Sequence, residues 1–276
     1  MGEIDIAWHP GFYSATELDF LEYSDVLEYE REHSLSKEPL KIDFMVIKRL
    51  ANVEIENDIG RIFRTYNIFE FKSPQDGLSI DDLYKTLGYA CLYKAMSDKT
   101  DAIPADEITV SLLRDRKPEK LLSRFNPEMR YPGVYYITGL QFPCQIIVSS
   151  ELGPEHAGLR ILSEHAEAPD IEAFLEKAKG YTKQGDKENA NSVLYVSINA
   201  NRKLYGSIRE EDKMYSALNE LMADELAKRE ARGEARGEDR LSSLMKNLLT
   251  AGRTQDALKV STDPVYRKQM LAAMVG

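Results

Sequence analysis

The sequence predicts a mixed α/β or α+β domain, followed by a helical extension toward the C-terminus. Strand-like and helix-like segments succeed one another up to about residue 166, whereas almost everything after it has helical period. The chain has 276 residues, of which 43% are hydrophobic and 30% are charged. This length and composition suit one sizeable core with a smaller appendage. We therefore expect a main domain over residues 1–166 and a helical extension over residues 167–276.

The first half of the domain is predicted to contain a helix, three strands, a second helix and a fourth strand. Residues 14–23 have apolar side chains at helical spacing, with Ser14 as the N-cap. Asp19 lies four residues after Ala15 and so near the inward face of this helix. The second helix begins after Ser79, because acidic side chains follow at its start. The three strands are expected within residues 26–36, 40–50 and 66–73, the second helix within 79–96, and a strand running into a short helix within 107–125.

The second half is predicted to add strands and then to become helical. Strands are expected within residues 133–140, 142–150 and 158–163, each bounded by Gly or Pro, and a helix within 168–184. Residues 213–252 have the pattern of one long helix, but residues 230–239, "EARGEARGED", repeat with a period of four. Each glycine there costs about 1 kcal/mol in a helix interior. The repeat is therefore either a charged linker or a helix completed by a partner chain, and the tail after it is either a small helical cap or a helix-turn-helix.

Composition narrows the classes of function. The formal charge of −10 argues against a protein that coats nucleic acid by charge alone, but leaves room for a local basic groove. There is no secretory signal and no apolar run long enough to span a membrane, so a cytoplasmic location is expected. Cys91 and Cys144 are expected to be buried thiols, and the sequence contains no GxGxxG, P-loop or GxSxG motif. The four histidines are scattered, without an HExxH or similar spacing, which predicts no zinc site: His9, His33, His156 and His165.

Three charged residues in apolar strands are the candidates for chemistry. In "IFEFKS", alternation puts Glu70 and Lys72 on one face of a strand and the two phenylalanines on the other. Asp43 interrupts an apolar run in the preceding strand, where a carboxylate is costly to bury unless it is paired or binds a metal. Hairpin pairing of the two strands would put Asp43 beside Glu70. Two carboxylates could then hold Mg²⁺ for phosphodiester hydrolysis while Lys72 serves the attacking water, whereas a salt bridge on a wet face is the simpler alternative.

The motifs "KID" at Asp43 and "EFK" at Glu70 to Lys72, in this order of elements, resemble the core of the PD-(D/E)XK nuclease superfamily. The resemblance covers roughly residues 14–115 and is nearest to the bacterial recombination-promoting nuclease and transposase-like branch. Two departures are Ile42 in place of proline and a long spacing between Asp43 and Glu70.

The resemblance implies a restriction-endonuclease-like core and a Mg²⁺- or Mn²⁺-dependent DNA endonuclease linked to recombination or transposition. Asp43 and Glu70 would bind the metal together with the backbone carbonyl of Phe71, and Lys72 would be catalytic. Asp19 would be the acidic residue of the first helix and a further ligand of the metal or of a metal-bound water, with Glu22 or Glu17 as alternatives. Tyr84 or Lys85 would face the site from the second helix.

Two hypotheses from different classes remain open at this point. One is the endonuclease, with DNA as its partner and a homodimer formed through the C-terminal helices. The other is a catalytically silent nuclease fold that binds DNA or protein through its helical tail. The apolar setting of Asp43 favours the enzyme, because a binding module has no need of a carboxylate there.

Overall fold

The structure, a computed structural model, describes residues 8–31, 44–51, 53–97 and 99–208, with scattered single positions beyond them. The chain divides into two compact units, Met1–Leu221 and Met222–Gly276. Only isolated positions of the second unit are described. The period-four repeat at 230–239 therefore lies outside the described residues, as does the rest of the predicted helical tail apart from those isolated positions.

A seven-stranded mixed sheet runs through the first unit in the order β1-β2-β3-β4-β7-β6-β5. The central strands β3, β4 and β7 pair in parallel, whereas the strands toward the two edges of the sheet pair in antiparallel fashion. This arrangement confirms the predicted mixed α/β class. The strands are β1 (Leu27–Arg31), β2 (Phe44–Arg49), β3 (Tyr66–Lys72), β4 (Ile108–Arg114), β5 (Glu128–Tyr131), β6 (Val134–Ile137) and β7 (Cys144–Val148).

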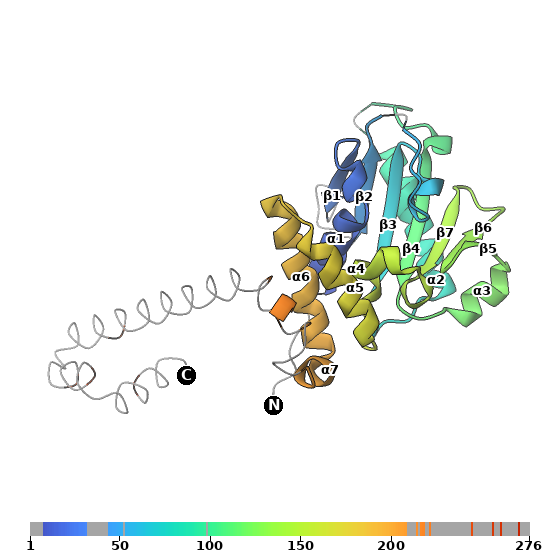
Figure 1. Ribbon diagram of the computed structural model, residues 1–276. Coiled ribbons are helices and arrows are strands. Elements are labelled where there is room, and N and C mark those ends of the chain that lie inside the picture. Colours follow the sequence, from blue (N-terminus) through green and yellow to red (C-terminus); the bar gives the residue numbers. More distant parts are fainter. Residues whose placement is uncertain are drawn as a thin grey trace. The chain divides into compact units, whose positions relative to one another are not determined.

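Helices cover both faces of this sheet, with α1, α4, α5 and α6 on one side and α2 on the other (Figure 1). None of the described helices has both the length and the apolar composition for crossing a membrane. The helices are α1 (Trp8–Asp19), α2 (Ile80–Ala95), α3 (Glu119–Phe125), α4 (Ala157–Arg160), α5 (Ala168–Lys179), α6 (Gln184–Ala200) and α7 (Arg202–Gly206).

Strand β3 is buried on both faces, and its side chains alternate as predicted. The ring of Phe12, from α1, lies 5.5 Å from the ring of Phe69 and 4.8 Å from that of Phe71. On the other face, Ile68 belongs to the core that includes Leu83 of α2. Glu70 and Lys72 share the face of Ile68, because side chains two apart in a strand point the same way. The two charges therefore lie between the sheet and α2.

Helix α2 begins where the sequence predicts. The Ser79 side chain accepts a hydrogen bond from the backbone N–H of Asp82, and the Asp82 side chain accepts one from the backbone N–H of Ser79. This reciprocal capping box satisfies two donors that the helix itself leaves without partners. It also fixes the position of Asp82 at the start of α2.

Several predictions of local structure are wrong. The first helix begins at Trp8 and not at Ser14, because its apolar face continues upstream, so Ser14 is buried inside the helix and caps nothing. Residues 158–163 form helix α4 and the turn after it, not a strand, since a short apolar run fits a buried helix equally well. Strand β5 went unpredicted because its side chains are mostly exposed and polar. Cys144 is buried as expected, but Cys91 is exposed.

A buried polar network joins β2, β3 and β4. The Asn67 side chain, in β3, donates to the carbonyls of Ile47 and Arg64 at 2.9 and 2.8 Å. Its oxygen accepts from the backbone N–H of Arg64 and from the Thr109 hydroxyl, at 2.8 and 2.6 Å. Asn67 is fully buried, and every polar group of its amide is engaged. Such a network fixes the register of β3, the strand that carries Glu70 and Lys72.

Replacing Asn67 by leucine should lower the free energy of unfolding by about 2–4 kcal/mol, because it leaves several buried partners without a hydrogen bond. Equilibrium denaturation measures this change. The matched control is Asn199→Leu, since Asn199 is only half-buried and donates to the carbonyl one turn back, that of Tyr195. A loss for Asn67→Leu no larger than for Asn199→Leu would contradict a structural role for the network.

Candidate functional site

The structure brings two of the predicted site residues together in an ion pair between a buried carboxylate and a partly buried ammonium. The Lys72 ammonium lies 3.3 Å from Glu70 Oε1 and 3.0 Å from Asp82 Oδ1. The side chains of Lys72 and Glu70 are only 16% and 8% exposed. The pair is therefore not the salt bridge on a wet face that the sequence also allowed.

One carboxylate oxygen of Glu70 has no partner in the part of the chain that the structure describes. This oxygen, Oε2, is buried. Burial raises the pKa of Glu70, and the positive charges of Lys72 and Lys85 offset only part of that rise. A buried carboxylate oxygen without a donor costs free energy unless a proton, water or a cation meets it. Glu70 is thus able to offer a free oxygen ligand.

Lys72 is held in its charged form. Burial by itself would lower the pKa of Lys72, but the hydrogen bonds and charges of Asp82 and Glu70 outweigh it and raise the pKa above its usual value. The opposing effects on Asp82 likewise end in a lowered pKa, because its bonds to Ser79 and Lys72 outweigh its desolvation. At neutral pH Lys72 is therefore an ammonium. It can stabilise negative charge or orient a water, but it is not a base.

The described structure does not show the other two predicted ligands, Asp43 and the Phe71 carbonyl, joining this ion pair. Asp43 lies outside the described residues, and Phe44, which follows it, is the residue paired with Glu70 across β2 and β3. Phe71 pairs with Leu113 of β4, and its side chain packs on α1. A role for the Phe71 carbonyl as a ligand stays a prediction.

Asp19 lies in a second cluster on the α1 side of the sheet. Its side chain is 3% exposed, in agreement with the inward position expected from its spacing to Ala15. Both of its carboxylate oxygens lie 2.9 Å from Nδ1 of His156, and Oδ2 also accepts from the Asn57 amide at 3.0 Å. Glu70, by contrast, faces α2 on the opposite side.

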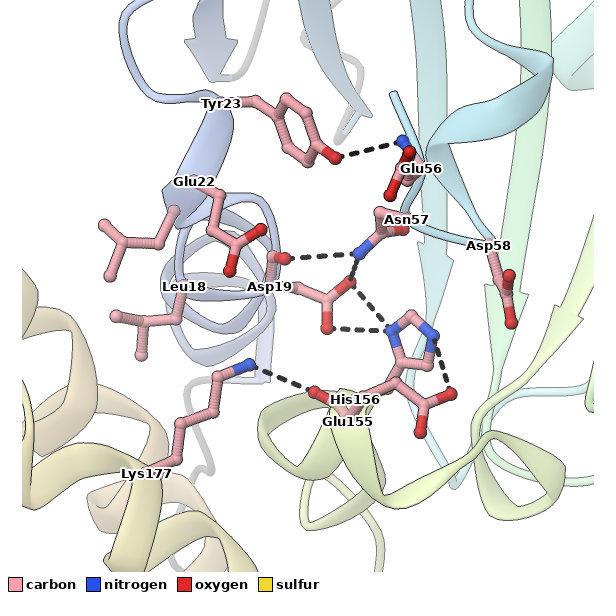
Figure 2. Close-up of a pocket in the computed structure, with 11 residues that line it drawn as sticks. Leu18, Asp19, Glu22, Tyr23, Glu56, Asn57, Asp58, Glu155, His156 and Lys177 are labelled. Carbon is pink, nitrogen blue, oxygen red and sulfur yellow. Dashed lines mark hydrogen bonds and ion pairs between the residues drawn. The ribbon is translucent and has the colours of Figure 1, made fainter. Parts of the chain in front are cut away.

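A cavity of about 430 Å³ adjoins this second cluster (Figure 2). Acidic side chains dominate its wall: Asp19, Glu22, Glu56, Asp58 and Glu155. Lys177 is the one lysine or arginine among the residues that line it, and its ammonium donates to the Glu155 carbonyl at 3.0 Å. The cavity therefore carries an excess of negative charge.

His156 is among the residues that line this cavity. Its side chain is 2% exposed, and Nε2 has no hydrogen-bond partner among the described residues. The nearest charged atom to Nε2 is Oε1 of Glu155 at 3.6 Å, which is too long for a hydrogen bond. Burial lowers the pKa of His156, but the bond to Asp19 and the charges of Glu155 and Asp58 outweigh it, so the net pKa is raised.

The loop before β3 holds Asp58 and Asn57 in place. The Asn57 side-chain oxygen accepts from the backbone N–H groups of Ile59 and Gly60 at 3.0 and 3.2 Å. At Gly60 a Cβ atom would meet Ile55 at 2.4 Å and Phe20 at 2.8 Å, so no larger residue fits without movement. The same loop is tied to η1 (Leu21–Tyr23) where the Tyr23 hydroxyl accepts from the backbone N–H of Glu56.

The sequence patterns do not predict this second cluster, since the spacing of the histidines indicates no zinc site. Its members come from three distant segments: the end of α1, the loop before β3 and the turn η5 (Pro154–His156). No local spacing joins Asp58 to His156, and motif rules consider only local spacing. The one available signal was Asp19, a carboxylate on the inward side of a helix.

Comparisons with protein-family models, with curated proteins and with solved structures found no match. The side chains themselves are therefore the basis for inferring function. They form two clusters: Glu70, Lys72 and Asp82 on the α2 side of the sheet, and Asp19, Asp58, Glu155 and His156 on the α1 side.

Replacing Lys72 by methionine should lower the free energy of unfolding by about 3 kcal/mol, because Glu70 is then left buried without its cation. The double variant Glu70→Gln/Lys72→Met should recover most of this loss. Lys48→Met is the matched control, because the Lys48–Glu30 pair links neighbouring strands but is 25% and 28% exposed, and it should cost only about 0.5 kcal/mol. Equal losses in urea denaturation for Lys72→Met and Lys48→Met would refute the burial argument.

Proposed function

We propose that this protein is a metal-dependent endonuclease that hydrolyses phosphodiester bonds in DNA, with Glu70 and Lys72 in its active site. The observation that carries the proposal is the buried carboxylate of Glu70, which has an oxygen without a hydrogen-bond partner among the described residues and lies next to the partly buried ammonium of Lys72. A salt bridge kept only for stability gains little from such burial, because desolvation offsets the attraction. Perturbed, buried charges of this kind are typical of active sites.

The order of elements supports a restriction-endonuclease-like core. Helix α1 is followed by the antiparallel strands β1, β2 and β3, then by α2 and by β4, which is parallel to β3. This is the order that the resemblance to the PD-(D/E)XK superfamily implies. In that arrangement Glu70 lies near the end of β3, and the polypeptide leads from it into α2, whose first turn carries Asp82.

The free oxygen of Glu70 suits a hard divalent cation such as Mg²⁺ or Mn²⁺, which prefers oxygen ligands. Asp43 and the Phe71 carbonyl would complete the protein's ligands in this proposal. The bound cation would supply Lewis-acid stabilisation of the phosphate and a more acidic water.

Lys72 would contribute its positive charge. Because its pKa is raised, the ammonium would stabilise the negative charge that develops on the phosphate, or orient the attacking water. Arg114 pairs with Lys72 across β3 and β4, and Lys85 is an exposed cation whose charge acts on Glu70. These three cations, two of them not paired with Glu70 or Asp82 in an ion pair, would be available to contact a phosphate backbone.

Recombination or transposition is the process we propose for this activity. A homodimer formed through the C-terminal extension would present two sites to the two strands of a duplex. The proposed process and the proposed homodimer both follow from the resemblance of the motifs at Asp43, Glu70 and Lys72. Both require that the protein cleaves DNA.

Purified protein should nick or cut supercoiled and linear DNA with Mg²⁺ or Mn²⁺ and lose this activity in EDTA. Glu70→Gln and Lys72→Met should each lower the rate by about 10²–10³-fold, because Glu70 would hold the cation and Lys72 would stabilise the negative charge of the transition state. Asp43→Asn should have an effect of the same size. The matched control is Glu30→Gln, which removes a carboxylate from the same sheet, on β1, and should leave cleavage unchanged.

Absence of cleavage with every metal and DNA form, in protein shown to be folded, would refute the enzyme. DNA retention in a gel-shift assay that does not depend on Glu70 would then favour the silent binding module. Cleavage that survives Glu70→Gln and Lys72→Met would instead indicate a contaminating nuclease or another active site.

A further inference from the structure

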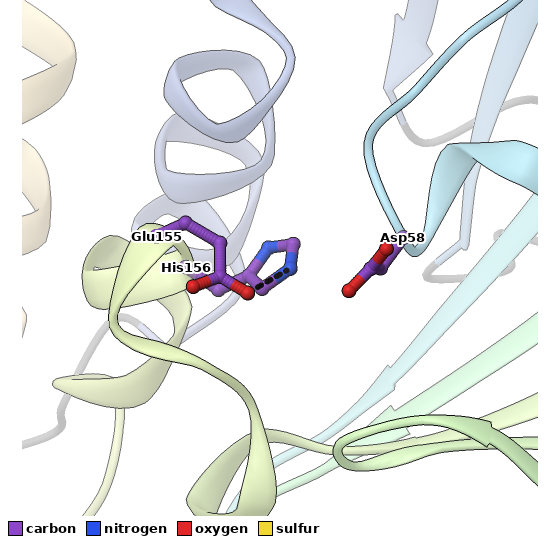
Figure 3. A group of neighbouring side chains, drawn as sticks. All are labelled: Asp58, Glu155 and His156. Atoms are coloured by element: carbon purple, nitrogen blue, oxygen red, sulfur yellow. Dashed lines mark ion pairs between the residues drawn. The ribbon is translucent and has the colours of Figure 1, made fainter.

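The second cluster contains a group that the proposed nuclease does not use. The His156 ring is almost fully buried, yet its Nε2 atom has no hydrogen-bond partner among the described residues. A buried ring nitrogen without a partner is costly, and in native proteins it calls for an explanation. The carboxylates of Glu155 and Asp58 lie on either side of it (Figure 3).

We propose that Asp58, Glu155 and Nε2 of His156 bind a divalent transition metal ion, and that Asp19 orients the histidine. One nitrogen or oxygen atom from each of the three residues lies within 4.8 Å of the others. Bonds of about 2.0–2.2 Å to a zinc-like ion require these atoms to approach by roughly 1–1.5 Å. The Glu155 side chain is 58% exposed and therefore able to rotate into place.

The contact between Asp19 and His156 is the feature that distinguishes this site from a group of surface acids. A metal-binding histidine ordinarily donates its other N–H to a carboxylate, which fixes the tautomer and directs the free lone pair to the metal. Asp19 lies 2.9 Å from Nδ1 on the far side of the ring, and the Asn57 amide holds Asp19 in turn. With Nδ1 as the donor, the lone pair of Nε2 faces the two carboxylates.

Charge at the cavity favours a cation. Three carboxylates, those of Asp19, Asp58 and Glu155, surround one imidazole. Among the described residues, Asp58 pairs with one positive charge, that of Arg61, whose Nε lies 4.0 Å from the carboxylate. The Lys177 ammonium donates to the backbone carbonyl of Glu155. A divalent ion would lower the repulsion among these carboxylates.

The set of ligands indicates the class of metal. One imidazole nitrogen with two carboxylates suits Zn²⁺, Mn²⁺, Fe²⁺ or Co²⁺ better than Mg²⁺, which prefers oxygen alone. Three protein ligands also leave a position open for water or for a molecule in the adjoining cavity. The site is thus separate from the Glu70 site in both its residues and its chemistry.

Cobalt is the probe that tests this site. Full-length protein freed of metal with a chelator should bind Co²⁺ and show visible d–d absorption bands. Asp58→Asn and His156→Gln should weaken this binding at least tenfold, and Asp19→Asn should weaken it by about 10–100-fold. In Cu²⁺-loaded protein, electron paramagnetic resonance should show hyperfine coupling to an imidazole nitrogen, which is lost in His156→Gln.

Two controls keep the result interpretable. Glu54→Gln removes another carboxylate that lies 3.9 Å from Arg61 but outside the cluster. This variant should bind Co²⁺ like the wild type. Glu70→Gln should retain the histidine-dependent Co²⁺ signal while losing cleavage, so this inference and the proposed nuclease fail independently. Since Asp58 is partly exposed, Asp58→Asn tests the site even where a buried change at His156 prevents folding.

The proposal is overturned if the metal-free protein binds no Co²⁺ or if Asp58→Asn binds it like Glu54→Gln. It is equally overturned if the bound ion shows no coupling to an imidazole nitrogen. In each of these cases the four residues form only a hydrogen-bonded ionic cluster that ties three segments together.

Discussion

Burial of β3 on both faces is the constraint on which the rest of the structure depends. One face packs against α1 through Phe69 and Phe71, and the other faces α2. Neither face of a strand in this position is fully open to solvent, so a charged side chain on it needs an opposite charge nearby. Lys72 therefore pairs with both Glu70 of β3 and Asp82 of α2. The capping box at Ser79 then has a second role, because it fixes the carboxylate that holds Lys72.

Much of this arrangement could be predicted from the sequence. Alternation in "IFEFKS" gave the faces of β3 correctly, and Ser79 followed by Asp82 gave the start of α2. Both signals are local, because the alternation repeats every two residues and Ser79 and Asp82 are three positions apart. The errors at Ser14 and at residues 158–163 arose where local patterns were ambiguous. An apolar run does not reveal whether it will form a buried strand or a buried helix, and tertiary packing decides.

The second cluster could not be predicted for a different reason. Asp58 and His156 are almost a hundred residues apart, and only the packing of η5 and the loop before β3 against the end of α1 brings them together. Gly60 makes that packing possible, because any side chain there would collide with Ile55 and Phe20. A sequence shows such a glycine without showing what lies against it. Prediction of this cluster would have required the fold first.

The two clusters lie on opposite faces of one sheet and differ in the chemistry they offer. At the Glu70 site, the carboxylate oxygen lies next to the Lys72 ammonium, whose positive charge weakens the binding of any cation. Such a site suits a metal ion that arrives together with a negatively charged phosphate. The His156 site presents nitrogen as well as oxygen, and the carboxylate of Asp19 behind the ring strengthens the nitrogen as a ligand. Among the described residues no lysine pairs with its carboxylates, and Arg61 lies 4.0 Å from Asp58. An ion that needs no substrate would therefore favour His156, whereas an ion that binds together with substrate would favour Glu70. This difference follows from the position of one positive charge, Lys72, and it makes a resident metal at one site compatible with an exchangeable metal at the other.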